Sequence, residues 1–314
     1  MARALFSRLT ILGIFLAMNT VAHGAELMSL DTALQTSYRA CMGIDDELSE
    51  LKKLAGINTA VTAVGTAAGA SATIVGLVKA KTDADIRNLR LQVIEAQADN
   101  PVWNNDKKAG VAFIKANFDA NATTDQKTKE QQLTEKSKKL GDWRTGLMAG
   151  ATATNIAGAV IAGVSVKKGD IQSHIDACTA SMNDLRNAIS QAKVKGEDVS
   201  EAQRIATACS GYKGQDVSKI QKRAKGALVA SVVGSATGVI GTATSAAANS
   251  DSVRKAGLET DAGAQKEKNL NTASNVLAGA TTAASATATV FNALEISAIK
   301  RIAQTAAECE GALR

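Results

Sequence analysis

Four cysteines are the residues of this 314-residue chain best able to do chemistry. They stand far apart, at Cys41, Cys178, Cys209 and Cys309. Paired thiols form disulfides, exchange electrons or bind a metal, but redox and zinc sites usually bring two cysteines within a few residues of each other. No such pair occurs here. The sequence therefore predicts two structural disulfides, an oxidising compartment and no metal site.

Motifs for catalysis are missing. His174 is the one histidine beyond residue 24, and no second histidine or carboxylate cluster accompanies it. The glycine-rich stretches fall inside helical periodicity, whereas phosphate loops, dinucleotide fingerprints and nucleophile elbows need glycines between a strand and a helix. We therefore expect no enzyme, no cofactor and no small-molecule substrate.

The first 24 residues have the pattern of a signal peptide. Arg3 and Arg8 precede an apolar stretch shorter than a bilayer needs, and Ala22-His23-Gly24 offers the small residues that signal peptidase reads. We expect cleavage after Gly24 and a periplasmic, envelope-associated or extracellular protein. Cleavage lowers the net charge from +6 to about +4. With both signs interspersed along the chain, this charge predicts no nucleic-acid partner.

The remainder contains an internal duplication, which predicts repeats at 25–198 and 199–314. Each repeat begins near a cysteine, passes through two segments rich in Gly, Ala, Ser and Thr, and ends near a second cysteine. The matching glycines lie at similar offsets from their cysteines: Gly65 at 24 residues from Cys41, Gly234 at 25 from Cys209, Gly150 at 28 from Cys178 and Gly279 at 30 from Cys309.

Equal arm lengths predict the disulfide pairing. Two arms that fold back at a tip bring the cysteines at their outer ends together, which favours Cys41 with Cys178 and Cys209 with Cys309. Four cysteines allow three connectivities, so the spacing alone leaves the other two open.

The arms have the periodicity of long helices. Apolar and small residues recur at three-four spacing from Leu54 to Val78 and from Leu140 to Ile189, and the set includes Val64 and Trp143. We expect an all-α fold of two antiparallel helical hairpins, resembling a coiled coil or four-helix bundle. Six glycines at Gly-xxx-Gly spacing are expected to allow close helix packing. They are Gly65, Gly69, Gly146, Gly150, Gly234 and Gly238.

The two repeats differ at their tips. The second has a short polar turn at 251–268, whereas the first has an insert at 82–137 that contains Trp103, Phe113 and Phe118. These aromatics form either a cap over the hairpin end or a partner-binding tip.

Two functions remain open. The first is a non-enzymatic exported scaffold that binds a protein partner or itself. The alternative is a membrane-active protein, because each of the four arms has an uncharged run of bilayer length. Their many Ala, Gly, Thr, Ser and Asn residues argue against stable insertion on hydropathy alone.

Overall fold

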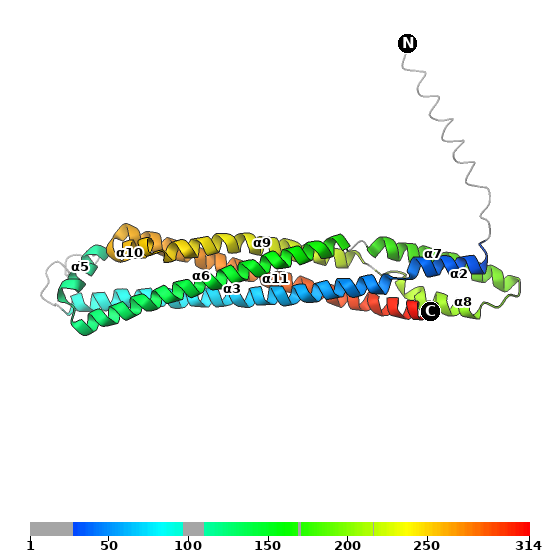
Figure 1. Cartoon of the computed structure of the whole chain (residues 1–314), viewed down its shortest axis with the longest axis horizontal. Helices are drawn as coiled ribbons and strands as arrows, with labels where there is room; N and C mark the ends of the chain where they lie inside the picture. The colour runs from blue at the N-terminus through cyan, green and yellow to red at the C-terminus, as the bar shows by residue number, and fades with distance from the viewer. Residues whose placement is uncertain (1–27, 97–109, 169–170, 216) are drawn as a thin grey trace, which may run out of the picture. The chain divides into compact units, whose positions relative to one another are not determined.

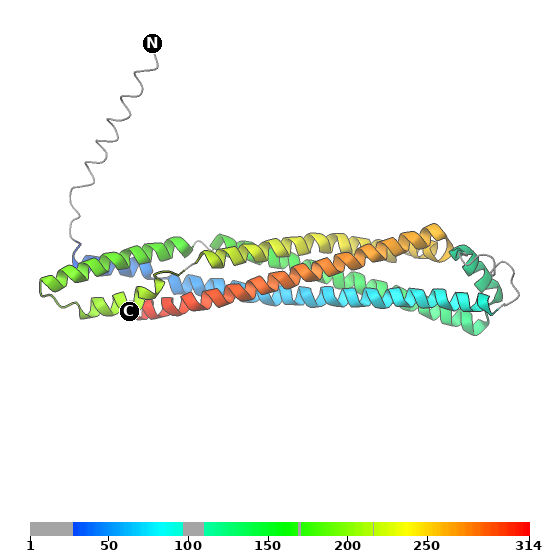
Figure 2. The ribbon, with the colours of Figure 1, turned by 180° about the vertical axis from the view of Figure 1, so that it is seen from behind.

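The computed structural model describes residues 28–96, 110–168, 171–215 and 217–314, and these residues form helices and no strand. The predicted all-α class is confirmed. The predicted signal peptide and Trp103 lie outside the described residues. Contacts divide the chain into two compact units. The helices, shown in Figures 1 and 2, are α2 (Leu30–Cys41), α3 (Ile44–Glu95), α5 (Val111–Asn121), α6 (Thr124–Lys168), α7 (Ile171–Val194), α8 (Ser200–Ala208), the 3-10 turn η1 (Cys209–Tyr212), α9 (Ser218–Asn249), α10 (Asp251–Glu259) and α11 (Asp261–Leu313).

Unit 1 consists of the described residues up to Glu47 together with 171–215 and 302–314. In this unit α2 packs on α7, and α8 and η1 also pack on α7. Its core is an ordinary apolar one, in which Ile175, Met182 and Leu185 are buried. Large buried side chains of this kind each contribute about 1.5–3 kcal/mol to folding.

Both disulfides lie in unit 1. Cys41 is bonded to Cys178 and Cys209 to Cys309, with Cα–Cα distances of 4.7 and 4.4 Å. This is the pairing that the arm lengths predict. The disulfides close sequence separations of 137 and 100 residues. All four cysteines are buried, as expected of structural bridges.

The start of α3 is held by a carboxylate from the end of α11. Gly43 has a φ of +90°, which lets the chain turn between α2 and α3. The backbone N–H groups of Gly43 and Asp45 then donate to Glu310 Oε1 at 3.1 and 3.0 Å. An anion at a helix N-terminus satisfies free N–H groups and the helix dipole.

Unit 2 contains residues 48–170 and 216–301, apart from those not described. Four long helices lie side by side (Figures 1 and 2), and each is antiparallel to two neighbours. In α6 and α9, for example, Asn155 lies against Gly234 and Met148 against Gly241, so the numbering runs in opposite directions. The same holds for α3 with α11, where Asn58 faces Asn292 and Gly76 faces Asn275. Each arm therefore packs against arms of both repeats.

The spacing from Leu140 to Ile189 predicts a single helix. The described residues of this span belong to α6, which is described as far as Lys168, and to α7, which is described from Ile171. Residues 169 and 170 lie outside the described residues, and contacts assign the two helices to different units.

Candidate functional site

Large aliphatic side chains cover the outside of unit 2. Val64 is 60% exposed and Val160 is 64% exposed, whereas side chains of this type usually lie in a core. We call the set the apolar belt. Its members are Ile57, Val64, Ile74, Leu77 and Val78 on α3; Trp143, Ile156, Val160 and Val164 on α6; Val229, Val232, Val233, Val239 and Ile240 on α9; and Val276, Val290 and Leu294 on α11.

The length of the belt matches a bilayer. From Ile57 to Val78 on α3, and from Trp143 to Val164 on α6, there are 21 residue steps. At 1.5 Å per residue each stretch is about 32 Å long, close to the roughly 30 Å of a hydrocarbon core. By length and composition, α3, α6 and α9 each contain a segment able to cross a membrane.

The interior of unit 2 combines small apolar residues with hydrogen-bonded polar ones. Ala72, Met148 and Ala278 form an apolar cluster. Asn58 donates to Asn292 Oδ1 at 3.0 Å across α3 and α11, and Ser285 donates to Asn155 Oδ1, also at 3.0 Å. The guanidinium of Arg144, which is 1% exposed, donates to the side chain and backbone oxygens of Asn271 at 3.2 and 3.1 Å. Polar side chains are thus buried between the helices, while many large aliphatic side chains face outward.

Some interior polar atoms have no partner among the described residues. Buried atoms of this kind include Asn58 Oδ1, Ser231 Oγ, Asn292 Nδ2 and Glu295 Oε1. Burial raises the pKa of the Glu295 carboxyl to about 7, while Arg223 acts in the opposite direction. An unpaired buried acceptor costs free energy, and burial disfavours the charged form of this carboxyl.

Four of the six predicted packing glycines make close contacts. A Cβ placed on Gly65 would lie 2.5 Å from Thr154 Oγ1, and one on Gly238 would lie 2.4 Å from Thr152 Oγ1. Gly69 and Gly234 are similarly close to Thr282 and Asn155. A side chain at any of these positions would force the helices apart.

Gly146 and Gly150 do not make the predicted contacts. Both are exposed, and a Cβ on either would meet nothing within 4 Å. The three-four pattern predicts the wrong face of each helix for the interface. Val64, Val78 and Trp143 belong to that pattern but point outward, and Trp143 is 69% exposed. The prediction of the helix interface rests on the expectation that apolar residues face the partner helix. The actual interface uses small and polar residues, because these allow closer approach and hydrogen bonding.

Phe113 and Phe118 are the predicted tip aromatics that the structure describes. Phe118 is 0% exposed and packs with Leu89 and Val93, and Phe113 is half-buried. Phe118 therefore belongs to a cap over the end of the bundle and is not available to a partner.

Buried ion pairs accompany this cap. Lys79 contacts Asp83 at 2.7 Å and Glu267 at 3.3 Å, and Arg90 is paired with Glu130. A cavity of about 900 Å³ lies beside them. Its two buried arginines, Arg90 and Arg254, already donate to protein oxygens, so they do not offer free cations to a ligand.

The described residues contain one group of potential metal ligands, the sulfurs of Cys41, Cys178 and Cys309, which lie within 4.8 Å of one another. These sulfurs belong to disulfides. His174 faces Glu47, with 3.2 Å between Nδ1 and Oε1, in an exposed pair. Nothing in this arrangement resembles a catalytic constellation.

Comparison with known proteins identifies no relative: no family model, curated protein or solved structure matches this chain. The belt and the polar interior are therefore the observations on which a function can be based.

Proposed function

We propose that this protein is membrane-active, with unit 2 inserting into a bilayer so that the apolar belt contacts lipid. The observation that carries the proposal is the arrangement of side chains in unit 2, where the many exposed Val, Ile and Leu side chains of the belt surround an interior that includes buried Asn, Ser, Thr and Arg. The proposal adopts the alternative that hydropathy alone disfavours.

Many of the small polar residues that lower the hydropathy of the arms are buried between the helices and would not face lipid. Small polar residues disfavour insertion when each faces lipid, but here Asn58, Thr62 and Asn155 are buried between helices and bonded to protein groups. The large side chains that would contact lipid are those of the belt, beside exposed small residues such as Ala67 and Ser71. At −0.3 to −0.6 kcal/mol for each central Leu, Ile, Phe or Val, the belt contributes on the order of −5 to −10 kcal/mol.

The interior also has the features of membrane helix pairs. Without a hydrophobic driving force between helices in lipid, association depends on close packing and interhelical hydrogen bonds. Both occur here, at Gly238 against Thr152 and at Ser285 with Asn155. The helices satisfy their own backbone groups, as a hydrocarbon environment requires.

The exported scaffold is the second candidate. Unit 1 favours it, because a disulfide-bridged apolar core is typical of a water-soluble exported domain. In that function the belt would be covered by a protein partner or by a second copy, since an exposed apolar patch of this size promotes association.

Flotation of the oxidised protein with liposomes, with release of an entrapped dye followed in the same sample, separates the two functions. Membrane activity predicts that the protein floats with lipid; dye release would add that insertion permeabilises the bilayer. The scaffold predicts that the protein stays in the buffer fraction as a discrete oligomer. Reduced protein serves as a comparison, because opening the disulfides frees the ends of the helices.

A further inference from the structure

We infer that the end of unit 2 from which its chain segments pass into unit 1 is a binding surface for anionic phospholipid headgroups. This inference rests on the proposed membrane insertion and adds a lipid class to it. The surface is a ring of cations that we call the basic collar. Its members are Lys52 and Lys53 on α3, Lys167 on α6, Lys222 and Lys225 on α9, and Lys300 and Arg301 on α11.

Contacts between the helices show that the collar residues lie at one level. Asn58 bonds to Asn292, and the Cβ position of Gly158 is 3.1 Å from Asn58 and 3.2 Å from Ser231, so these four residues share a layer. Every collar residue lies five to nine residues from the layer member on its own helix, in the direction of unit 1 in the sequence. At 1.5 Å per residue the ring occupies a slab about 8–14 Å from the layer.

The collar borders the apolar belt at the distance expected of headgroups. On α3, α9 and α11 the last belt residues at this end are Ile57, Val229 and Leu294, and the nearest collar residue follows four to six positions further, whereas Val164 on α6 lies at the level of the collar. Four to six positions are about 6–9 Å, comparable with the headgroup region outside a hydrocarbon core. Lysine stems can also lie along apolar surface while their ammonium groups reach water or phosphate.

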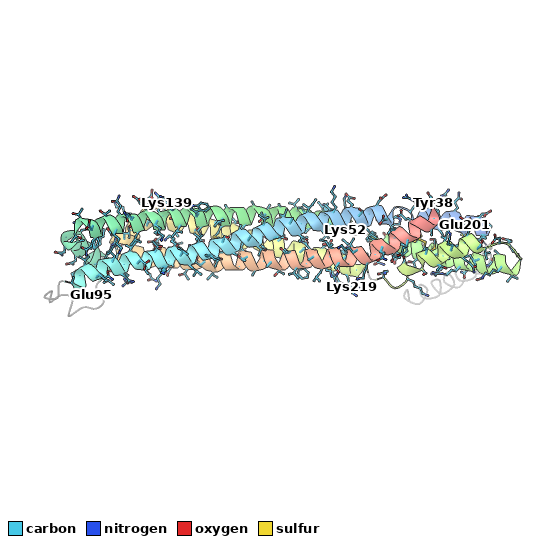
Figure 3. All side chains as sticks on the ribbon, turned by 90° about the horizontal axis from the view of Figure 1, so that it is seen from below. Tyr38, Lys52, Glu95, Lys139, Glu201 and Lys219 are labelled. Atoms are coloured by element: carbon cyan, nitrogen blue, oxygen red, sulfur yellow. A yellow bond between two sulfur atoms is a disulfide. The ribbon has the colours of Figure 1, made fainter. Side chains whose placement is uncertain are left out.

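Cations outnumber carboxylates at this level. The collar residues are exposed, as Figure 3 illustrates for Lys52, and they make no salt bridge within the described structure. One carboxylate of unit 2, Glu50, is described at the same level, and it is already paired with Lys168. Glu295 lies three residues from the layer residue Asn292 and is buried in the interior. The chain as a whole has interspersed charges, but folding gathers cations from four separate segments.

A phosphate-rich surface is the partner that this geometry fits. The cations surround a bundle whose adjoining surface is apolar, so one planar interface can contact both. Each lysine near an anionic membrane surface strengthens binding about fivefold at moderate ionic strength.

The test compares vesicles of phosphatidylcholine with vesicles of phosphatidylcholine and phosphatidylglycerol, using the full oxidised protein. A collar variant carries Lys52→Gln, Lys53→Gln, Lys222→Gln and Lys225→Gln. A matched control carries Lys127→Gln, Lys129→Gln, Lys193→Gln and Lys195→Gln, four exposed lysines that do not belong to the collar. Circular dichroism verifies that both variants keep the helical content of the parent.

We expect the parent and the control to bind the anionic vesicles more tightly than the neutral ones, and the collar variant to lose at least tenfold of that gain. The gain should also disappear in about 1 M salt, where the Debye length falls to about 3 Å. Equal binding of the parent to both vesicles, or equal losses in the two variants, would overturn the collar and leave membrane insertion standing. Absence of the parent from both vesicle fractions would overturn the proposed function, and the collar with it.

Discussion

Substitution of Val64 by aspartate distinguishes lipid contact from water contact at the belt. Val64 is 60% exposed and lies about 5 Å from the middle of the α3 stretch between Ile57 and Val78. In lipid, replacing a central valine by aspartate costs about 3 kcal/mol on the insertion scale, which is about a hundredfold in partitioning. In water, the same exposed substitution changes stability by no more than about 0.5 kcal/mol.

The assay is the partition coefficient of the oxidised protein between buffer and liposomes, measured by flotation. Val194→Asp is the matched control, because Val194 is 90% exposed and ends α7 in unit 1. We expect Val64→Asp to partition about a hundredfold less than the parent, and Val194→Asp to partition like the parent. Thermal unfolding in buffer should be similar for all three. Equal partitioning of the two variants would refute the assignment of the belt to lipid.

Four further predictions concern packing, disulfides and pH. Gly238→Ala should destabilise the protein by about 1–3 kcal/mol, because its Cβ would meet Thr152. Gly150→Ala should stabilise it by up to about 1 kcal/mol, because a Cβ there meets nothing within 4 Å and alanine favours a helix. Equal effects of the two variants in denaturant unfolding would contradict the packing. The double variant Cys209→Ser/Cys309→Ser removes a disulfide that spans 100 residues, and its free energy of unfolding should fall by about 4–5 kcal/mol in the chain-entropy model. A fall of less than about 1 kcal/mol in denaturant unfolding would contradict a stabilising role for this disulfide. The single variant Cys209→Ser should instead show disulfide exchange by peptide mapping, since Cys309 Sγ lies within 4.8 Å of the Cys41 and Cys178 sulfurs; intact Cys41–Cys178 alone would argue against it. The folded-state pKa of Glu295 is raised from 4.5 to about 7, so the folded state binds the proton more tightly than the unfolded state. This carboxyl should therefore lower the free energy of unfolding as the pH rises through that interval. Glu295→Gln should remove this dependence, and parallel pH profiles of stability for the parent and the variant would contradict it.

The helical class and the cysteine pairing are predictable from the sequence because both follow from local periodicity and from distances along the chain. Gly65 and Gly234 stand at nearly equal offsets from Cys41 and Cys209, and arms of equal length return their cysteines to one place. The close contacts of Gly65 and Gly238 also follow from spacing, since small residues four positions apart share one helix face.

The orientation of each helix about its own axis is decided only in the tertiary structure. The three-four spacing places Val64 on the apolar stripe of α3 and Trp143 on that of α6, and Thr62 and Arg144 lie on neighbouring stripes of the same helices. Periodicity identifies such stripes but does not say whether a stripe faces a helix, water or lipid. In water an apolar stripe is expected to be buried, and that assumption gives the wrong answer for Gly146, Gly150 and Trp143.

The sequence by itself thus determined that the chain is helical and favoured the cysteine pairing that the structure shows, because these properties depend on neighbours and on chain length. Only the tertiary structure decided that Asn58, Asn155 and Arg144 are buried while Val64 is exposed. It also decided that lysines from four distant segments share one level. Both depend on how four helices turn toward one another, since close backbone approach and interhelical hydrogen bonds here outweigh the burial of aliphatic side chains.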